Sequence, residues 1–252
     1  MEILVCVKRV PATGGRITLT PDGMDIDTRY LGFTISPHEE CAVEEAVRLV
    51  TAHGGSVTVL TLGPDAATEQ LRDALAIGAE HAQLLETDGT DWDPGQTATA
   101  IVEAIRARPG PAYDLLLFGN EAADSGDYQV PVRVAQALGL PCVTGVKALE
   151  VGEESATARR EASGGWEVFE LPLPAVVSVK EGINLPRYPS VPGRLRARRI
   201  EIDRSTPMAG PATLQKLRLR LPEEQEHQAE ILGRGPDAAP AVVALFERLG
   251  LV

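Results

Sequence analysis

The chain has 252 residues, of which 44% are hydrophobic and 24% are charged, and its formal net charge is −12. These values are ordinary for a soluble globular protein of one large or two small domains, and they exclude disordered and collagen-like classes. The acidic excess argues against a general attraction to nucleic acid or to an anionic membrane surface. An aromatic content of 4% is too low for a protein that stacks single-stranded nucleic acid.

The first 145 residues predict an α/β protein with a doubly wound, mostly parallel sheet, because short apolar runs alternate with helical patterns. The clearest helix begins at Ser36, since Pro37 suits the first helical position and Glu39 completes an S-x-x-E capping box. Gly54 and Gly55 end this helix. The segment 12–35 is an excursion that could form a small hairpin between Arg16 and Tyr30. The other expected elements are strands at 3–7, 56–62, 83–85 and 113–118, and helices at 65–77, 95–108 and 130–138.

The second part of the chain predicts a hairpin, two further strands and a polar arm. Residues 146–151 and 155–161 form the hairpin, which turns near Glu153 and Glu154, and residues 166–171 add a strand. The apolar run 173–179 returns to the central sheet. Residues 184–193 hold three prolines and predict an exposed, stiff loop without regular structure. Residues 194–252 predict an arm that a partner orders, with a helix at 239–249; the alternative is a loose tail with one packed helix.

The cysteines and histidines do not indicate a metal or redox centre. Cys6, Cys41 and Cys142 are odd in number and form no C-x-x-C pair, so we expect core residues rather than disulfides, zinc ligands or nucleophiles. We expect no metal site, serine triad or catalytic carboxylate pair. The start MEILVCVKRVP reads as a first strand rather than a signal peptide, and no apolar run reaches the ~18 residues that span a bilayer. We expect a cytoplasmic protein without direct membrane insertion.

The loop 119–130, GNEAADSGDYQV, is the most informative stretch, because it leaves the carboxyl end of a parallel strand and enters a helix. Backbone N–H groups at that helix start could hold a phosphate, and two glycines permit close approach. The loop matches neither G-x-G-x-x-G nor a P-loop, so a flexible acidic surface loop is the alternative. The phosphate-holding residues would be Tyr128, Gln129 and Val130, flanked by Gly119 and Gly126.

Three further loops would line the same edge of the sheet: Cys6–Lys8, Ser36–His38 and Leu62–Pro64. Backbone groups collected from these loops suit an adenine nucleotide. Lys8 could instead be a solvated charge at a strand end. Asp124 and Asp127 are spaced like metal ligands, but no oxygen cage surrounds them.

A basic segment runs from Arg187 to Arg199 with five arginines and no acidic residue. Against the negative net charge, this local reversal could steer an acidic partner protein to the chain. The alternative is a solubilising surface strand with Arg198 and Arg199 in water.

These stretches resemble the beta subunit of electron transfer flavoprotein over residues 1 to about 205. The matching motifs occur in the family's order, and the tail beyond 205 matches weakly. The motifs are VCVKRVP, SPHEECAVEEAVRL, TLGPDAATEQLRDALAIGAEHA, DLLLFGNEAADSGDYQV, LPLPAVVSVKEGINLPRYPSVPG and RLRARRIEI.

The resemblance implies a heterodimer with an alpha subunit that holds the redox-active FAD. This chain would supply an adenine-nucleotide-binding domain, residues 1–204, and an arm, residues 205–252, that wraps the alpha subunit. The dimer would carry electrons from acyl-CoA or other flavin dehydrogenases, as in fatty acid beta-oxidation, to a quinone oxidoreductase. The subunit itself would be an electron carrier and not an enzyme. A stand-alone nucleotide-sensing protein of similar fold is the alternative, although the basic segment and the arm favour the carrier.

The resemblance also implies which residues bind. The nucleotide is AMP in most members and a second FAD in electron-bifurcating members. The residues that would line it are Cys6, Val7, Lys8, Ser36, Pro37, Leu62, Gly63, Gly119, Asn120, Ala122, Asp124, Gly126, Asp127, Tyr128, Gln129 and Val130. The loop that would recognise the dehydrogenase consists of Pro186, Arg187, Tyr188, Pro189, Ser190 and Val191.

The sequence departs from the family pattern at three positions. Val130 stands where many AMP-binding members have a hydroxyl residue, and the pair Gln129–Val130 looks more like the bifurcating members. We favour AMP over FAD for this site. Val191 replaces the family's usual leucine in the recognition loop, and Thr13 replaces an aromatic residue that lies near the FAD ring in some members.

Overall fold

The computed structural model describes residues 1–12, 14, 17–222 and 231–252. Contacts divide the chain into two units, Met1–Arg218 and Leu219–Val252. The sequence places its domain boundary at 204/205, whereas residues 206–218 belong to the first unit, in which Gly210 and Leu214 are hydrogen-bonded to Gln96 and Asp93. We call residues 206–218 the strap.

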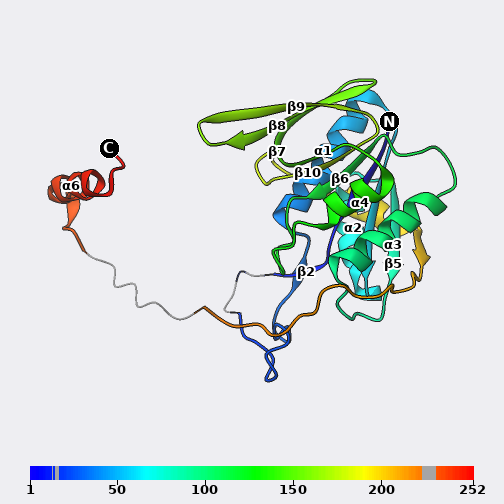
Figure 1. The fold of residues 1–252 in the computed structure, drawn as a ribbon, viewed down its shortest axis with the longest axis horizontal. Helices are drawn as coiled ribbons and strands as arrows, with labels where there is room; N and C mark the ends of the chain where they lie inside the picture. Colours follow the sequence, from blue (N-terminus) through cyan, green and yellow to red (C-terminus); the bar gives the residue numbers. More distant parts are fainter. Residues whose placement is uncertain (13, 15–16, 223–230) are drawn as a thin grey trace. The chain divides into compact units, whose positions relative to one another are not determined.

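The first unit is built on a nine-stranded sheet within the described residues, with the order β11-β5-β4-β1-β6-β10-β7-β8-β9 (Figure 1). The pairs from β11 to β7 are parallel, and β7, β8 and β9 are antiparallel. The strands are β1 (Glu2–Cys6), β4 (Ser56–Gly63), β5 (His81–Glu86), β6 (Leu115–Gly119), β7 (Cys142–Val151), β8 (Ser155–Ala162), β9 (Gly165–Pro172), β10 (Ala175–Val179) and β11 (Ile202–Ser205). This arrangement confirms the predicted doubly wound, mostly parallel α/β fold.

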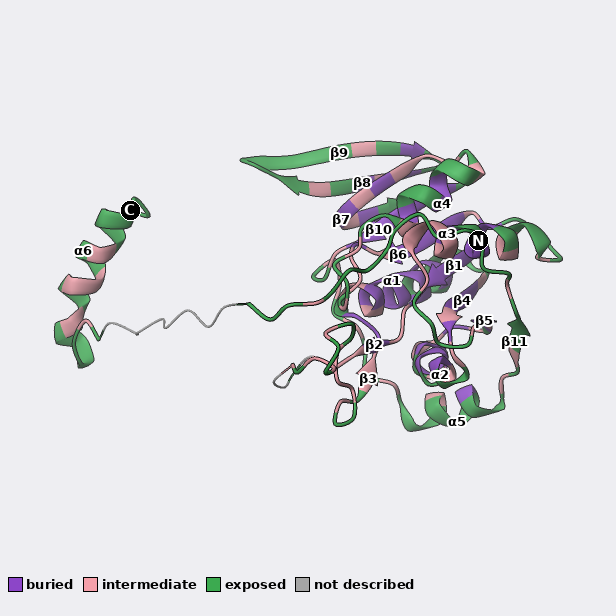
Figure 2. Ribbon diagram, turned by 60° about the horizontal axis from the view of Figure 1, so that its bottom comes forward, coloured by how far each residue is buried: buried purple, intermediate pink, exposed green. Residues whose placement is uncertain are grey.

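Helices cover both faces of the sheet, and its central strands are buried between them (Figure 2). Residues of β1 alternate between the two faces: Ile3 and Val5 pack in one apolar cluster, and Leu4 and Cys6 in the other. The first cluster takes side chains from α1 and α2, and the second from α3 and α4. The helices are α1 (Pro37–His53), α2 (Thr68–Ile77), which follows the 3₁₀ turn Asp65–Ala67, α3 (Pro94–Ala107), α4 (Val130–Leu138) and α5 (Val191–Arg199).

Chain order reverses direction across the sheet at β1. The strands β4 and β5 follow β1 on one side, while β6 pairs with its other side. Ligands of open α/β sheets bind beyond the carboxyl ends of the strands at such a reversal. The predicted binding loop 119–130 leaves β6 at this point.

Several local predictions are confirmed. The capping box of Ser36 and Glu39 begins α1, which ends before Gly54. The hairpin of β7 and β8 turns at 152–154, and the run 173–179 returns to the sheet as β10 between β6 and β7. Strand β5 is longer than the predicted 83–85, because its ends are set by pairing with β4 and β11.

The prediction that residues 184–193 have no regular structure is wrong at its end, because α5 begins at Val191. Ser190 is the N-cap: its Oγ accepts the N–H of Gly193 at 3.1 Å, and Pro192 is tolerated in the first helical turn. The alternative of a surface strand for Arg198 and Arg199 is also wrong. Both are exposed on α5, whose buried Ala197 packs in the first apolar cluster.

A small antiparallel pair, β2 (Val10–Pro11) with β3 (Phe33–Thr34), closes the excursion after β1. Within it, Leu19 and Ile26 form an isolated bridge. The predicted hairpin begins at Arg16, which lies outside the described residues, as does Thr13.

The second unit contains the 3₁₀ turn Gly235–Ala238 and the helix α6 (Ala239–Leu249), as predicted at 239–249. Among the residues described, no side chain of α6 is buried. Val243, Phe246, Leu249 and Leu251 are exposed apolar residues in and after this helix. Across the ranges that the structure describes, no helix combines the length and apolar character needed to cross a membrane.

Candidate functional site

The carboxyl edge of the sheet brings the predicted nucleotide-binding loops together. Cys6 lies opposite Leu60 of β4 and Phe118 of β6, so the residues that follow each strand emerge side by side. These are Val7 and Lys8 after β1, Leu62 and Gly63 at the end of β4, and Gly119 at the end of β6.

Glu39 joins three of these segments at the start of α1. Its Oε2 accepts the N–H of Lys8 at 3.0 Å and that of Ser36 at 3.3 Å, while Ser36 Oγ accepts the Glu39 N–H. A Cβ on Gly119 would lie 2.7 Å from Glu39 Cγ, so only glycine allows β6 to approach the helix this closely. Gly119 therefore allows the edge of the sheet to pack against α1. The space beside its Cα is filled by Glu39 and is not available to a ligand.

The Glu39 carboxyl is almost fully buried, and burial raises its pKa from the ordinary 4.5 to about 7, opposed by the two backbone hydrogen bonds. The edge thus holds a carboxyl whose charge changes near neutral pH. Cys6 is also buried, and desolvation together with the nearby Glu39 raises the pKa of its thiol. The thiol is therefore protonated, and Cys6 is a core residue, as expected.

The loop 119–130 is a tight turn tied to the end of β1. Lys8 Nζ lies 2.8 Å from the Asp124 carboxylate. Within the turn, the N–H of Ala122 donates to Asp127 O and the N–H of Gly126 donates to Ala122 O. Gly126 has φ +62°, a left-handed conformation that a side chain would strain, although the space around its Cα is open.

The start of α4 offers a partly open set of amide donors. No side chain of the described residues caps this helix, since the Gln129 side chain accepts hydrogen bonds from Arg133 instead. The Gln129 N–H, expected to hold a phosphate, donates to Asp127 Oδ1 at 3.0 Å. Val130 N–H has no side-chain partner in the part of the chain that the structure describes, and Pro131 has no N–H. The open first turn of a nine-residue helix suits an anion.

Several predicted site residues have structural duties at this edge. Asn120 is buried, donates its N–H to Val179 O at 3.0 Å and accepts the Ser178 hydroxyl at 3.2 Å, which ties β6 to β10. The Gly63 carbonyl accepts the Thr87 N–H. Leu62 packs against the second apolar cluster, and Pro37 is exposed.

His38 lies in one of the predicted edge loops, but sequence reasoning assigned no binding role to it. In the first turn of α1, its Nδ1 is buried without a hydrogen-bond partner among the described residues. Its Nε2 lies 3.9 Å from Glu121 Oε1, and Tyr128 OH donates to the same carboxylate. The sequence does contain a signal for a binding role of His38, because it is a polar residue just after the N-cap of a helix that starts at the carboxyl edge.

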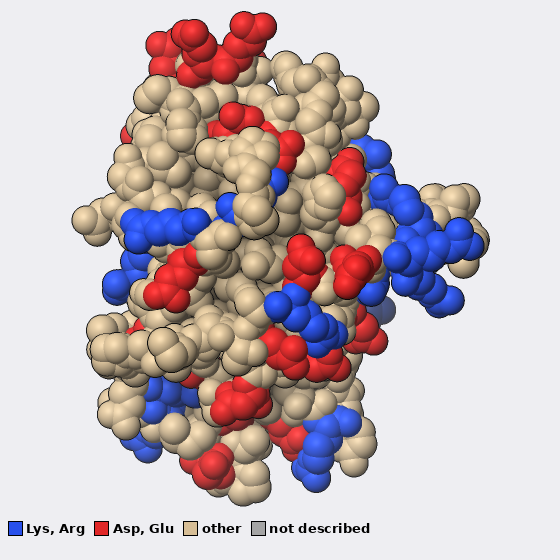
Figure 3. Space-filling model, turned by 90° about the vertical axis from the view of Figure 1, so that its right-hand side faces the viewer, with Lys and Arg blue, Asp and Glu red and all other residues tan. Residues whose placement is uncertain are grey.

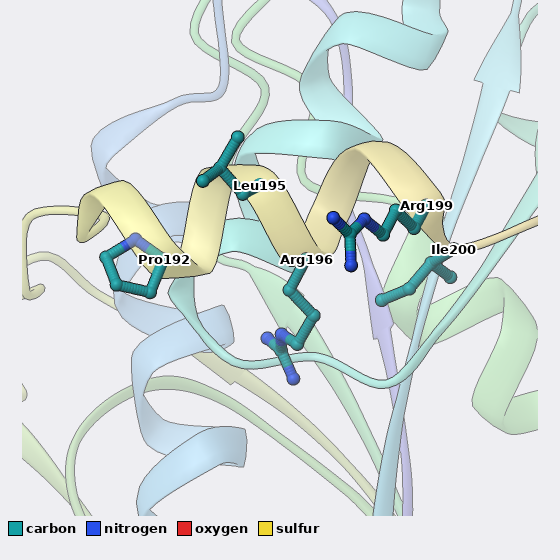
Figure 4. Close-up of a pocket in the computed structure, with 5 residues that line it drawn as sticks. All are labelled: Pro192, Leu195, Arg196, Arg199 and Ile200. Carbon is teal, nitrogen blue, oxygen red and sulfur yellow. The ribbon is translucent and has the colours of Figure 1, made fainter.

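Among the described residues, the hollows that lie away from this edge include the following two. One, of about 640 Å³, is lined by β7, β9 and the start of α4, and includes Cys142 and Arg160. Burial raises the pKa of the Cys142 thiol to about 11. The other, of about 400 Å³, lies on α5 (Figure 4). Its lining residues are Pro192, Leu195, Arg196, Arg199 and Ile200.

The predicted recognition loop 186–191 presents apolar side chains to solvent. Tyr188 is 97% exposed and Val191 is 72% exposed, and the neighbouring Leu185 is 91% exposed. Arg187 is different, because its guanidinium pairs with Glu44 through two contacts of 2.8 Å. The loop therefore combines solvent-exposed apolar side chains with one arginine that is already paired with a carboxylate.

The arginines of α5 divide into committed and free groups. Arg196 donates to Leu75 O at 2.6 Å, which fixes α5 to α2. Arg194, Arg198 and Arg199 have no ion pair within 4.0 Å among the described residues. On the face of the molecule seen in Figure 3, a group of basic side chains projects at one side, beside acidic patches.

Comparison with known proteins gives one consistent result. The model of the electron transfer flavoprotein domain matches residues 24–208. Three proteins named electron transfer flavoprotein subunit beta are similar. That of Bacillus subtilis is 35% identical over 199 residues, covering 79% of this chain and 76% of that protein. That of Syntrophomonas wolfei is 38% identical over 223 residues, with coverages of 88% and 86%. That of Mycobacterium leprae is 38% identical over 207 residues, with coverages of 80% and 77%.

Proposed function

The chain belongs to the electron transfer flavoprotein family, as a beta subunit, and from this premise we propose that it works as one half of a heterodimeric electron carrier. Its partner is an alpha subunit that holds the redox-active FAD. The similarity to beta subunits over about four fifths of the chain carries the proposal. The FAD supplies the group that accepts and donates electrons. This chain binds the alpha subunit and a nucleotide, and it docks the dehydrogenase.

The second unit supports the heterodimer. The helix α6 has an apolar sequence but buries no side chain within the described residues, and the exposed Val243, Phe246 and Leu249 lie on it. Exposed apolar side chains of this number on one short helix are typical of a surface that another protein covers. We propose that the alpha subunit covers this arm.

At the carboxyl edge we propose an adenylate, AMP rather than FAD. Two features fit a phosphate there, the uncapped start of α4 and the tight turn at Gly126, and Lys8, paired with Asp124, adds a cation at the same edge. The His38 Nδ1, without a partner among the described residues, is a polar atom at the same edge that a ligand or water would satisfy. The acidic neighbours Asp124 and Glu121 fit ribose hydroxyls better than phosphate oxygens.

The loop 186–191 is the proposed docking site for an electron-donating flavin dehydrogenase, such as an acyl-CoA dehydrogenase. The exposed Tyr188 and Val191 would enter an apolar pocket of that partner. Electrons would then pass to a quinone oxidoreductase, as in fatty acid beta-oxidation. We place this carrier in the cytoplasm.

Co-expression with an alpha-type subunit tests the proposal. Size-exclusion chromatography should show a one-to-one complex, and denaturation of the complex should release FAD and AMP, identified by absorption and mass. Two flavins per complex would point to the electron-bifurcating type. The residue pair Gln129–Val130 is similar to the pair found in that type. A chain that stays alone yet releases an adenine nucleotide would be a stand-alone sensor instead.

A further inference from the structure

The loop between β10 and α5 alternates anchored and exposed residues. Asn184 donates through Nδ2 to Cys41 O at 3.0 Å and to Glu45 Oε2 at 2.8 Å, and the next residue, Leu185, is exposed. Arg187 is held by Glu44, and the next residue, Tyr188, is exposed. The exposed residues Leu185 and Tyr188 thus each follow a residue that is hydrogen-bonded to α1.

Both anchors are carboxylates at adjacent positions of α1. Glu44 accepts the Arg187 N–H at 3.2 Å in addition to the two guanidinium contacts, and its Oε2 takes part in both kinds of bond. The side chain of Glu44 is 6% exposed and that of Glu45 is 8% exposed. A buried carboxylate requires its partners, and a two-point arginine pair fixes orientation as well as distance.

We propose that Glu44 and Glu45 are positioning residues for dehydrogenase docking: they hold the loop 184–190 in its docking conformation before the partner arrives. Ordering a loop on binding lowers affinity, so a loop that is already fixed binds more tightly. The inference rests on the proposed docking role of loop 186–191.

The matched control lies on the same helix. Glu40 is one turn before Glu44, is partly buried, and makes no hydrogen bond to residues 184–191 among the described residues. Glu40→Gln removes a carboxylate of the same helix without touching the anchors. Arg187→Gln alone would leave the buried Glu44 carboxylate without its partner. If that variant misfolds, the double variant Glu44→Gln/Arg187→Gln replaces it, because it removes both charges and leaves no buried carboxylate unpaired.

The experiment uses the assembled flavoprotein and an acyl-CoA dehydrogenase reduced by its acyl-CoA. Hydrogen exchange reports the order of the amides of Leu185, Arg187 and Tyr188, and steady-state reduction gives KM for the flavoprotein and kcat. We expect Glu44→Gln and the double variant to speed exchange and raise KM about tenfold, equal to about 1.4 kcal/mol. The value of kcat should stay unchanged, and Glu40→Gln should alter neither readout.

The outcomes separate this inference from the docking proposal. Unchanged exchange in Glu44→Gln would overturn the positioning role. Faster exchange with an unchanged KM would also overturn it, provided that Val191→Asp raises KM and so upholds docking by the loop. If Val191→Asp and Glu44→Gln both leave KM unchanged, the loop is not the docking surface and both proposals fail.

Discussion

Lys8 and Asp124 are 116 positions apart in the sequence, yet Lys8 Nζ lies 2.8 Å from the Asp124 carboxylate. The pair joins the end of β1 to the loop after β6 at the point where chain order reverses across the sheet. It therefore fixes the mouth of the proposed nucleotide site, and the conformation of that loop should decide whether a nucleotide binds.

Gly126→Val should expel the nucleotide. The reason is backbone strain rather than crowding, because Gly126 has φ +62° and nothing described lies within 4 Å of an added Cβ. A left-handed residue other than glycine costs about 1–2 kcal/mol, and more for a β-branched one. Native mass spectrometry of the purified protein measures the bound adenylate.

Gly139→Val is the matched control for this variant, since Gly139 has φ +69° with equally open space at the other end of α4. It should keep the nucleotide. Loss from both variants would mean that general destabilisation, not the loop, releases the ligand.

Glu39→Gln should change the pH dependence of stability. The folded-state pKa of Glu39 is raised from 4.5 to about 7, so the folded protein holds this proton more tightly than the unfolded chain. As pH rises from 4.5 to 7, the wild-type protein should lose about 3 kcal/mol of stability relative to the Glu39→Gln variant. Urea unfolding of both proteins at pH 5 and at about pH 7.5 measures the difference; parallel pH profiles would contradict the assignment.

Asp93→Ser should loosen residues 213 and 214 of the strap without unfolding α3. Asp93 Oδ1 caps α3 through the Gln96 N–H, while Oδ2 accepts the N–H groups of Thr213 and Leu214. Serine retains a capping oxygen and loses the second role. Exchange of the Thr213 and Leu214 amides should therefore accelerate.

Asp93→Ala provides the comparison, because it loses both roles. It should loosen residues 213 and 214 equally and also lower the free energy of unfolding by about 1 kcal/mol. Equal stability of the Ser and Ala variants would show that the cap contributes nothing here.

Val191→Ala should weaken dehydrogenase docking. Loss of two buried carbon groups, at about 0.8 kcal/mol for each, predicts a decrease in affinity of about 15-fold. Val191→Leu should bind as well as wild type or better, if the partner pocket fits the leucine that is usual in the family. Val168→Ala, at an exposed valine of β9, serves as the control, and an equal loss there would argue against a specific anchor.

Arg194→Glu should slow association mainly at low salt, since Arg194 is exposed and acts through long-range charge. Arg196→Glu should in addition destabilise the fold, because Arg196 ties α5 to Leu75 O. Stopped-flow reduction at two salt concentrations, alongside urea unfolding, separates the effects. Equal salt dependence in both variants and in wild type would remove these arginines from steering.

Truncation after Arg218 should leave the first unit folded and abolish the heterodimer, because it removes only the second unit. Truncation after Ser205 also removes the strap and its bonds to Asp93, so it tests more than the arm. Size-exclusion chromatography with the alpha subunit gives the result. An intact complex with the 1–218 chain would contradict the role of α6.

The sequence alone determined what depends on neighbours along the chain. The apolar runs and helical periods specified a doubly wound sheet, and the capping box Ser36–Glu39 specified where α1 begins. The same local signals placed loop 119–130 at the carboxyl edge, because strand direction fixes where a following loop emerges.

Only the tertiary structure decided what depends on distant partners. Local proline content predicted a loop through 193, but α5 begins within it, and Arg72 of α2 satisfies the end of that helix by donating to the carbonyls of Ala197 and Ile200. Arg187 read as a free docking charge, whereas Glu44, 143 positions away, pairs with it. Such pairings follow from how the layers stack, which no local pattern encodes.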